Sequence, residues 1–493
     1  MISKNTKILW YFILLFLAVN ILTLKNGHNW GDDFCQYILH AKNIVEHESY
    51  QRSFDLDQGV ISPPGFPFLL VPLLKYFGLN FVLLKLPNLI FWVFYVLSLR
   101  FIMRKRLKEG LALLGSLFIL TSPSFFTFKQ NILTDIPFLS FVTGAIYLFE
   151  KYAETKKGGG SHKAIIYLIA AAFLMFYSIL IRFSGVLLLI AACIYFSTFK
   201  KDKRALMAIT GFGITSLGIQ YFLGVSFSLH LQEKNIPLLE GVVRAYGYLS
   251  EIFIYLFSFF FPIWTTVGKA GNRTLWNIIP QISLLLIACI IAVFCYRVIR
   301  KKTTFTELFT IIYLFGLIIW GISGGGRYIL PLAGPVLIFC IELFHNSFEY
   351  FKKKMPRNTY FQPDKIIGFM LFCLILHNIY AIAVNFHFDD NDVNKREVRE
   401  LVRWIRYNVK NEEHIMFPKH RALGLLTEKK VATYFVASTK ERNLAERIQR
   451  HNIRYLIIPN KDRPIIMRIA ESNNIIIRPA WANDAFRIFM VIS

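Results

Sequence analysis

The feature that most constrains this chain is a recurring pattern of long apolar runs separated by short basic clusters. We expect about eleven runs to cross a bilayer, because each has roughly 15–24 residues and a spanning helix needs about 20. A 55% hydrophobic content and a mean hydropathy of +0.46 also predict a polytopic α-helical membrane protein. The expected spans are residues 8–24, 81–103, 110–128, 132–150, 164–181, 185–199, 205–224, 276–299, 305–322, 328–347 and 365–384.

The formal net charge of +25 fits the same interpretation. Lys and Arg retain cytoplasmic loops by the positive-inside rule, so the charge does not call for a nucleic-acid partner. If the N-terminus is cytoplasmic and the first run is an uncleaved span, all the main basic clusters fall on one side. Those clusters are residues 100–108, 151–163, 200–204, 297–302 and 352–357.

Two further apolar stretches, residues 63–78 and 247–267, would break this alternation if they were counted as spans. We expect both to lie on the outer surface or to be re-entrant, since polar backbone at that depth must line a protein cavity. We therefore predict a membrane domain over residues 1–385, with outer-face loops at 25–80 and 225–275. Six scattered cysteines show neither zinc spacing nor a disulfide pattern.

The tail changes character, and we predict a small extracytoplasmic α/β domain over residues 386–493. It lacks a glycine-rich phosphate loop, and we assign it no chemistry. Its expected helices are residues 394–409 and 441–451, and its expected strands are 414–417, 431–435, 455–458, 474–478 and 486–492.

Two adjacent carboxylates, Asp32 and Asp33, follow the first span. Apolar residues recur behind them at helical spacing, which predicts an amphipathic helix lying on the bilayer. Asp33 with Gln36 fits a capping box, whereas Asp32 precedes the cap and has no such structural role. Charges this close to lipid are costly unless they are used, so we predict that Asp32 is a catalytic base.

Two more motifs fall on the same outer side. The run from Ser62 to Pro67 is either a simple turn or a wall of a substrate groove. Asp135 starts the fourth span within Thr134-Asp135-Ile136-Pro137, which fits an N-cap with proline in the first turn. Alternatively, Asp135 supplies a second carboxylate that orients the acceptor or holds a cation.

Several cations depart from the positive-inside pattern at the outer ends of spans: Lys85, Lys129, Arg182 and Arg327, the last followed by Tyr328. Each alone is most simply a side chain snorkelling to lipid headgroups. Together, near two outer acids, they suit a leaving phosphate. An outward-facing site meets no nucleotide donor, so an activated sugar would arrive on a lipid such as a polyprenyl phosphate.

These motifs resemble those of GT-C class membrane glycosyltransferases, of the protein O-mannosyltransferase and lipid A aminoarabinose transferase type. The likeness covers about residues 1–385 and is carried by five motifs in order: residues 30–33, 63–67, 134–137, 182–185 and 327–331. Asp32 occupies the position of the catalytic Asp in that family, and Asp33 replaces its usual Glu. The resemblance implies inverting transfer of a sugar from a polyprenyl phosphate to a lipid, glycan or protein hydroxyl.

In that scheme Asp32 deprotonates the acceptor, Asp135 positions acceptor or sugar, and the cations stabilise the departing phosphate. No cofactor is required, although a carboxylate pair could bind a divalent cation, and metal use stays open. We expect a multi-pass protein of the bacterial-type inner (plasma) membrane. The rival interpretations are a transporter or flippase of lipid-linked sugars, a surface-glycan polymerase or ligase, and a non-catalytic envelope protein.

Overall fold

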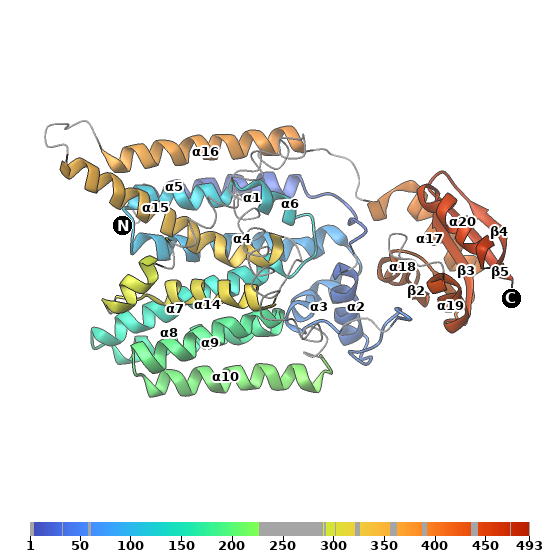
Figure 1. The fold of residues 1–493 in the computed structure, drawn as a ribbon, viewed down its shortest axis with the longest axis horizontal. Coiled ribbons are helices and arrows are strands. Elements are labelled where there is room, and N and C mark those ends of the chain that lie inside the picture. Colours follow the sequence, from blue (N-terminus) through green and yellow to red (C-terminus); the bar gives the residue numbers. More distant parts are fainter. Residues whose placement is uncertain are drawn as a thin grey trace.

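The computed structural model contains a bundle of long helices with a small α/β domain at one end (Figure 1). It describes residues 4–31, 33–57, 61–225, 289, 292–300, 302–320, 326–354, 362–386, 392–434, 442–473 and 475–492. The protein is therefore a polytopic α-helical membrane protein with a C-terminal sheet domain, as the sequence predicts. The apolar stretch at 247–267 and most of the run at 276–299 lie outside the described residues.

Seven helices in the described part of the chain are long and apolar enough to cross a membrane. Two further expected spans, 185–199 and 305–322, correspond to the shorter apolar helices Phe183–Phe199 and Phe305–Ile319. The bundle helices are α1 (Lys4–Leu22), α4 (Phe81–Arg104), α5 (Glu109–Leu120), α6 (Pro123–Phe128), α7 (Asp135–Lys157), α8 (Ser161–Ile181), α9 (Val186–Ile194), α10 (Lys203–Phe222), α14 (Phe305–Trp320), α15 (Leu330–Lys354) and α16 (Pro363–Asn385).

Helix α7 lies at the centre of the bundle and packs against α4 and α8. Its first half is buried on every side, so the side chain at its start, Asp135, has almost no contact with solvent. Large apolar side chains elsewhere point outward, among them Leu14, Ile166 and Phe222, which are 60%, 65% and 87% exposed. Exposed apolar surface of this extent is stable in lipid and not in water.

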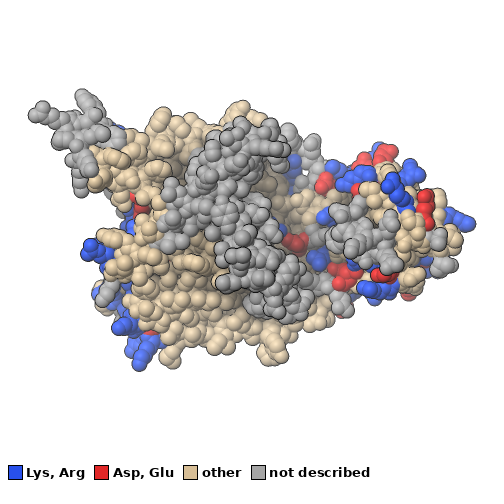
Figure 2. Space-filling model, in the orientation of Figure 1, with Lys and Arg blue, Asp and Glu red and all other residues tan. Residues whose placement is uncertain are grey.

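The helix ends divide into two groups. At one end, ion pairs join neighbouring helices, including Lys156–Asp202 (2.6 Å) and Arg106–Glu150 (3.5 Å). Lys and Arg side chains also gather at this end in the surface view (Figure 2). The C-terminal domain and the short helices α2 (Asp33–Val45) and α3 (Gly65–Phe77) lie at the opposite end (Figure 1).

Helix α2 differs from the expected surface helix. Its apolar residues Phe34, Ile38 and Ala41 are at most 1% exposed and pack against α3 and the C-terminal domain, not lipid. The expectation that this helix lies on the bilayer is wrong, because folding supplies a protein surface for the apolar stripe. Helix α3 begins after two prolines, and its 13 residues are too few to cross a bilayer.

The C-terminal domain has a five-stranded sheet in the order β2-β1-β3-β5-β4. The strands β2, β1 and β3 are parallel, and β5 is antiparallel to both β3 and β4. The sequence predicted all five strands and two helices but missed α18 and α20. The elements are α17 (Arg396–Asn408), β1 (His414–Met416), α18 (His420–Thr427), β2 (Val431–Ala432), α19 (Arg442–Arg450), β3 (Ile453–Pro459), α20 (Arg463–Ser472), β4 (Ile476–Ala482) and β5 (Phe486–Ile492).

The first outer loop fastens this domain to the bundle. Val431 on the sheet edge donates its backbone N–H to the carbonyl of Phe54 (2.8 Å) and accepts from Leu56 (3.1 Å). In the same segment, Asp55 contacts His420 (3.0 Å) and Arg421 (3.2 Å). The loop therefore adds a strand-like segment to the edge of the sheet. Its buried Asp55 carboxylate faces the imidazole of His420 and the guanidinium of Arg421.

Candidate functional site

Two guanidinium groups converge on one buried carboxylate at the end of the bundle that carries the C-terminal domain. Arg182 Nη1 lies 2.7 Å from Asp135 Oδ1, and Arg327 Nη2 lies 3.0 Å from Asp135 Oδ2. The Asp135 side chain is 1% exposed, whereas the Arg327 side chain is 29% exposed. The Arg327 side chain is thus partly open to solvent while Asp135 holds its guanidinium in place.

Arg327 also joins this carboxylate to the acid pair. Its Nη1 donates to Asp33 Oδ2 over 2.8 Å, so a single side chain bridges Asp33 and Asp135. The Asp33 side chain is 48% exposed and open to solvent. Asp32 lies outside the described residues. In the sequence it directly precedes Asp33, which is part of this cluster. The four paired residues come from chain positions 33, 135, 182 and 327.

Aromatic side chains surround the arginines. The guanidinium of Arg182 lies over the ring of Tyr328, 4.4 Å from its centroid, a distance at which a cation–π interaction is favourable. Tyr313 donates its hydroxyl to the backbone carbonyl of Tyr328 (3.0 Å) and so fixes that segment. Burial, followed by the charge of Asp33, raises the pKa of Tyr37 to about 12, so its phenol is protonated at neutral pH.

Local backbone structure directs Arg182 to this place. Helix α8 ends at Ile181, and Arg182 is extended, with φ −150° and ψ 139°, before a short 3-10 turn at Phe183–Gly185. That turn folds back tightly, because a Cβ on Gly185 would lie 2.7 Å from the backbone nitrogen of Ile179. Glycine is needed at this close approach, and the turn aims Arg182 across the bundle toward Asp135.

Lys85 and Lys129 do not join the cluster. Both side chains are fully buried. The Lys85 ammonium donates to the backbone carbonyls of Lys25 and Gly27, each over 2.7 Å. The Lys129 ammonium contacts the hydroxyl of Thr23 and lies 3.5 Å from the centroid of Phe126. These contacts fix the segment that follows α1. Neither lysine therefore contacts the carboxylates of the cluster.

The two described carboxylates of this cluster, Asp33 and Asp135, are both paired with arginines. Among the described residues, no group of three or more His, Cys, Asp or Glu side chains could hold a metal ion. Asp33 and Asp135 share Arg327 between them, which occupies the space that a bridging cation would need.

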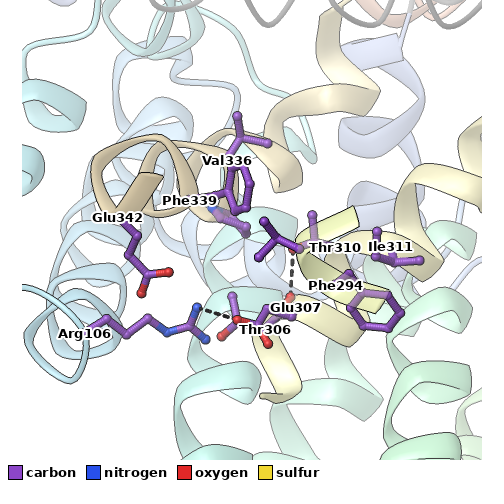
Figure 3. A pocket seen from close by; sticks show the side chains of 11 residues that line it. Arg106, Phe294, Thr306, Glu307, Thr310, Ile311, Val336, Phe339 and Glu342 are labelled. Atoms are coloured by element: carbon purple, nitrogen blue, oxygen red, sulfur yellow. Dashed lines mark hydrogen bonds and ion pairs between the residues drawn. The ribbon is translucent and has the colours of Figure 1, made fainter. Parts of the chain in front are cut away.

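A second charged cluster lies at the opposite, basic end of the bundle (Figure 3). There Arg106 Nη1 lies 3.5 Å from Glu307, while Arg297 contacts both Glu307 and Glu342. Arg106, Glu307 and Glu342 line a cavity of about 30 Å³, which has room for little more than a water molecule. Its geometry is that of an interhelical ion-pair network, which ties α14 and α15 to the turn after α4.

Sequence reasoning singled out Asp33, Asp135, Arg182, Arg327 and Tyr328, and the structure brings these five together. It missed His28 and Tyr313, which support the same region. Trp30, from the motif at residues 30–33, packs against Phe417 of the C-terminal domain, with ring centroids 5.5 Å apart. A lone histidine in a loop gives no periodic signal and Tyr313 lies inside an apolar run, so nothing in the sequence marked these two residues as neighbours of the site.

Comparisons with known proteins show what the chain and its fold are similar to. Residues 62–225 match the family described as dolichyl-phosphate-mannose-protein mannosyltransferase. No curated protein matches the chain by sequence. Among solved structures, an Archaeoglobus fulgidus oligosaccharyltransferase, in complex with Zn and sulfate, aligns with a TM-score of 0.58 and 13% identity over 92% of this chain and 67% of that one.

ArnT from Cupriavidus metallidurans aligns nearly end to end. In the apo state it gives a TM-score of 0.58 and 10% identity, over 99% of this chain and 98% of that one. The same protein bound to undecaprenyl phosphate aligns with a TM-score of 0.56. At such low identity these likenesses establish the fold. The chain is thus a multi-pass membrane protein with the GT-C fold of these structures, and residues 62–225 are similar to the dolichyl-phosphate-mannose-protein mannosyltransferase family.

Proposed function

We propose that this protein is an inverting glycosyltransferase that moves a sugar from a polyprenyl-phosphate donor to a hydroxyl acceptor. One observation carries the proposal: Arg182 and Arg327 converge on Asp135 at the bundle end where the acid pair begins α2. Fixed guanidinium groups at one end of a membrane bundle suit a phosphate whose hydrocarbon tail remains in the bilayer. In this proposal Asp32, which directly precedes Asp33 in the sequence, accepts the proton of the incoming hydroxyl.

In this reaction the acceptor oxygen attacks the anomeric carbon from the face opposite the phosphate. The bond between that carbon and the phosphate oxygen breaks, and the electron pair leaves with the phosphate. Asp32 takes the proton of the acceptor hydroxyl, which raises the nucleophilicity of the oxygen. The lipid phosphate gains negative charge as it departs, and the partly exposed guanidinium of Arg327 stabilises that charge, an electrostatic effect that is strong in a site sheltered from water.

The other paired residues have supporting roles. Asp135 accepts from two guanidinium groups, so it is a poor proton acceptor and serves to aim both arginines. Asp33 holds the outer face of Arg327 until the phosphate arrives. Tyr328, stacked on Arg182, keeps that guanidinium in its plane. We leave Lys85 and Lys129 out of the donor site, because their ammonium groups bind the chain after α1.

The proposal includes a lipid-linked donor, since the ArnT structure was obtained with undecaprenyl phosphate and an archaeal oligosaccharyltransferase with a dolichol phosphate. It also assigns the site to the outer side of a plasma membrane, because Lys and Arg side chains of the membrane bundle gather at the end opposite the site (Figure 2), as the positive-inside rule expects of a cytoplasmic face. The C-terminal domain is then extracytoplasmic. The acceptor class remains lipid, glycan or protein.

The test is mass spectrometry of envelope glycolipids and glycoproteins from a deletion strain complemented with wild type or variants. We expect one glycoform to disappear on deletion and to return with wild type but not with Asp32→Asn or Arg327→Gln. Arg297→Gln is the matched control, since Arg297 also binds two carboxylates, Glu307 and Glu342, but at the far end of the bundle. Full rescue by Asp32→Asn would remove the base, and full rescue by Arg327→Gln would remove the phosphate-binding role.

An assay of the purified protein distinguishes a transferase from a transporter of lipid-linked sugars. Incubated in detergent with a polyprenyl-phosphate sugar and an acceptor extract, a transferase releases free polyprenyl phosphate and a glycosylated product. A transporter leaves the donor intact, because no membrane separates two compartments in a micelle. Donor that survives in the presence of every acceptor fraction would contradict the proposed reaction.

A further inference from the structure

His28 lies between the two carboxylate-bearing segments of the site and contacts both. Its ring is stacked on Phe34, with centroids 3.7 Å apart and planes 19° apart. Phe34 directly follows Asp33 in α2. On the other side, the ring Nε2 accepts a hydrogen bond from the backbone N–H of Ile132 over 2.9 Å. Ile132 lies three residues before Asp135, the buried carboxylate that holds both arginines.

A third contact reaches the C-terminal domain. The backbone carbonyl of His28 accepts from the N–H of Val393 over 2.9 Å. The neighbouring side chains add a link to the same turn, since the Asn29 amide donates to Asn131 Oδ1 over 3.1 Å. His28 is 1% exposed, so water cannot replace any of these contacts. One residue therefore joins the acid-pair segment, the turn before α7 and the first turn after the membrane bundle.

The hydrogen bonds fix the tautomer of the ring. Nε2 faces an N–H donor and must carry a lone pair, while Nδ1 lies 3.0 Å from the carbonyl of Asn29 and must carry the proton. This is a neutral imidazole. In agreement, burial lowers the pKa of His28 to about 4, with the nearby Lys85 ammonium acting in the same direction.

We propose that His28 is a positioning residue that sets the spacing between Asp33, at the start of α2, and the arginine-bound Asp135. The inference rests on the proposed glycosyl transfer, which needs base and phosphate-binding groups at a fixed separation. His28 touches neither substrate nor phosphate in this scheme. Its effect is transmitted through Phe34 on one side and Ile132 on the other.

A matched control, His40 in α2, distinguishes this positioning role from a merely structural one. His40 is also buried, at 2% exposed, and its ring is stacked on Tyr50 with centroids 4.4 Å apart. Its Nε2 likewise accepts from a backbone N–H, that of Ser62, over 3.3 Å. His28 and His40 therefore make equivalent contacts, but only His28 joins the segments that carry Asp33 and Asp135.

The experiment compares His28→Phe, His28→Gln and His40→Phe in purified full-length protein, with initial rates over a range of donor concentrations. Phe keeps the stacking and removes the acceptor, whereas Gln restores an acceptor for the Ile132 N–H. We expect His28→Phe to lower kcat at least tenfold with KM for the donor within about threefold. We expect His28→Gln to recover most of kcat, and His40→Phe to change it less than threefold.

Hydrogen–deuterium exchange of the peptide containing Ile132 supplies a readout that does not depend on activity. His28→Phe should speed its exchange at least tenfold, and His40→Phe should leave it unchanged. Equal losses of kcat in the two Phe variants, or unchanged exchange at Ile132, would overturn the inference. A wild type that transfers no sugar but shows the expected exchange pattern would instead contradict the proposed function.

Discussion

Arg327 makes two ion pairs, with Asp33 and with Asp135, because a guanidinium offers several N–H donors in a fixed plane. An ammonium carries its three N–H donors on one nitrogen and lacks the planar spread of a guanidinium, so it cannot span the same two carboxylates. The partial exposure of Arg327 beside the almost fully buried Asp135 shows which of the two can reach a ligand.

The first prediction concerns this geometry. Arg327→Lys should keep the net charge yet lower kcat by about 10²–10³-fold, the loss typical of removing one preorganised donor to a developing anion. Steady-state kinetics with a polyprenyl-phosphate sugar measure the change, and Arg297→Lys at the opposite end serves as control. A kcat within threefold of wild type would show that charge alone is sufficient.

The second prediction follows from the neutral histidines. Burial lowers the pKa of both His28 and His40 to about 4, whereas an unfolded histidine titrates near 6.5. Between these values the unfolded chain binds more protons, so stability should fall as the pH drops from about 6.5 toward 4. Thermal melts of wild type and His28→Gln should converge at low pH, and an equal pH slope for both would contradict this.

Among the elements, α2 shows how a segment can be read correctly as a helix and wrongly placed. Its apolar stripe was evident from spacing, but spacing does not say whether lipid or protein covers the stripe. In the structure, protein covers the stripe, including apolar residues of the C-terminal domain. The domain also contacts α2 through the ion pair between Lys42 and Glu428, and strand β2 pairs with the first outer loop.

The third prediction tests this attachment. Burial alone would raise the pKa of Asp55, but the hydrogen bond and charge of His420, with Arg421, hold it below its usual range. Asp55 therefore stabilises the docked loop above about pH 4, and the contribution is lost as the pH falls through the lowered pKa. Asp55→Asn should speed hydrogen exchange at Val431 by about 10–100-fold at pH 7, corresponding to roughly 1–3 kcal/mol.

A matched control is available in the same loop. Ser53→Ala changes an exposed residue whose hydroxyl only accepts from the Asp55 backbone. It should leave exchange at Val431 unchanged. If Asp55→Asn and Ser53→Ala behaved alike, the carboxylate contacts would not hold the loop on the sheet edge.

At the scale of the whole molecule, the two ends of the bundle differ in chemistry. One end has the interhelical ion pairs and many Lys and Arg side chains, and the other has the candidate site and the sheet domain (Figures 1 and 2). The alternation of helix direction places Lys157, at the end of α7, and Glu471, in α20, at opposite ends.

The fourth prediction is therefore one of sidedness. In a background without the six natural cysteines, Glu471→Cys should react with a membrane-impermeant maleimide in intact cells. Lys157→Cys should react only after the membrane is permeabilised. Gel-shift or mass analysis of the labelled protein measures both, and the reverse labelling pattern would place the site on the cytoplasmic side.

The sequence by itself determined the membrane class, most helix limits, the C-terminal strands, the four residues of the ion-pair cluster and the neighbouring Tyr328. These are local or periodic properties: apolar run length, charge between runs, and motifs at helix ends. Tertiary structure decided which cations share a carboxylate: Arg182 and Arg327 converge on Asp135, whereas Lys85 and Lys129 bind the chain after α1. It also decided what covers α2 and what His28 joins, because contacts between residues more than 100 positions apart leave no trace in a single sequence.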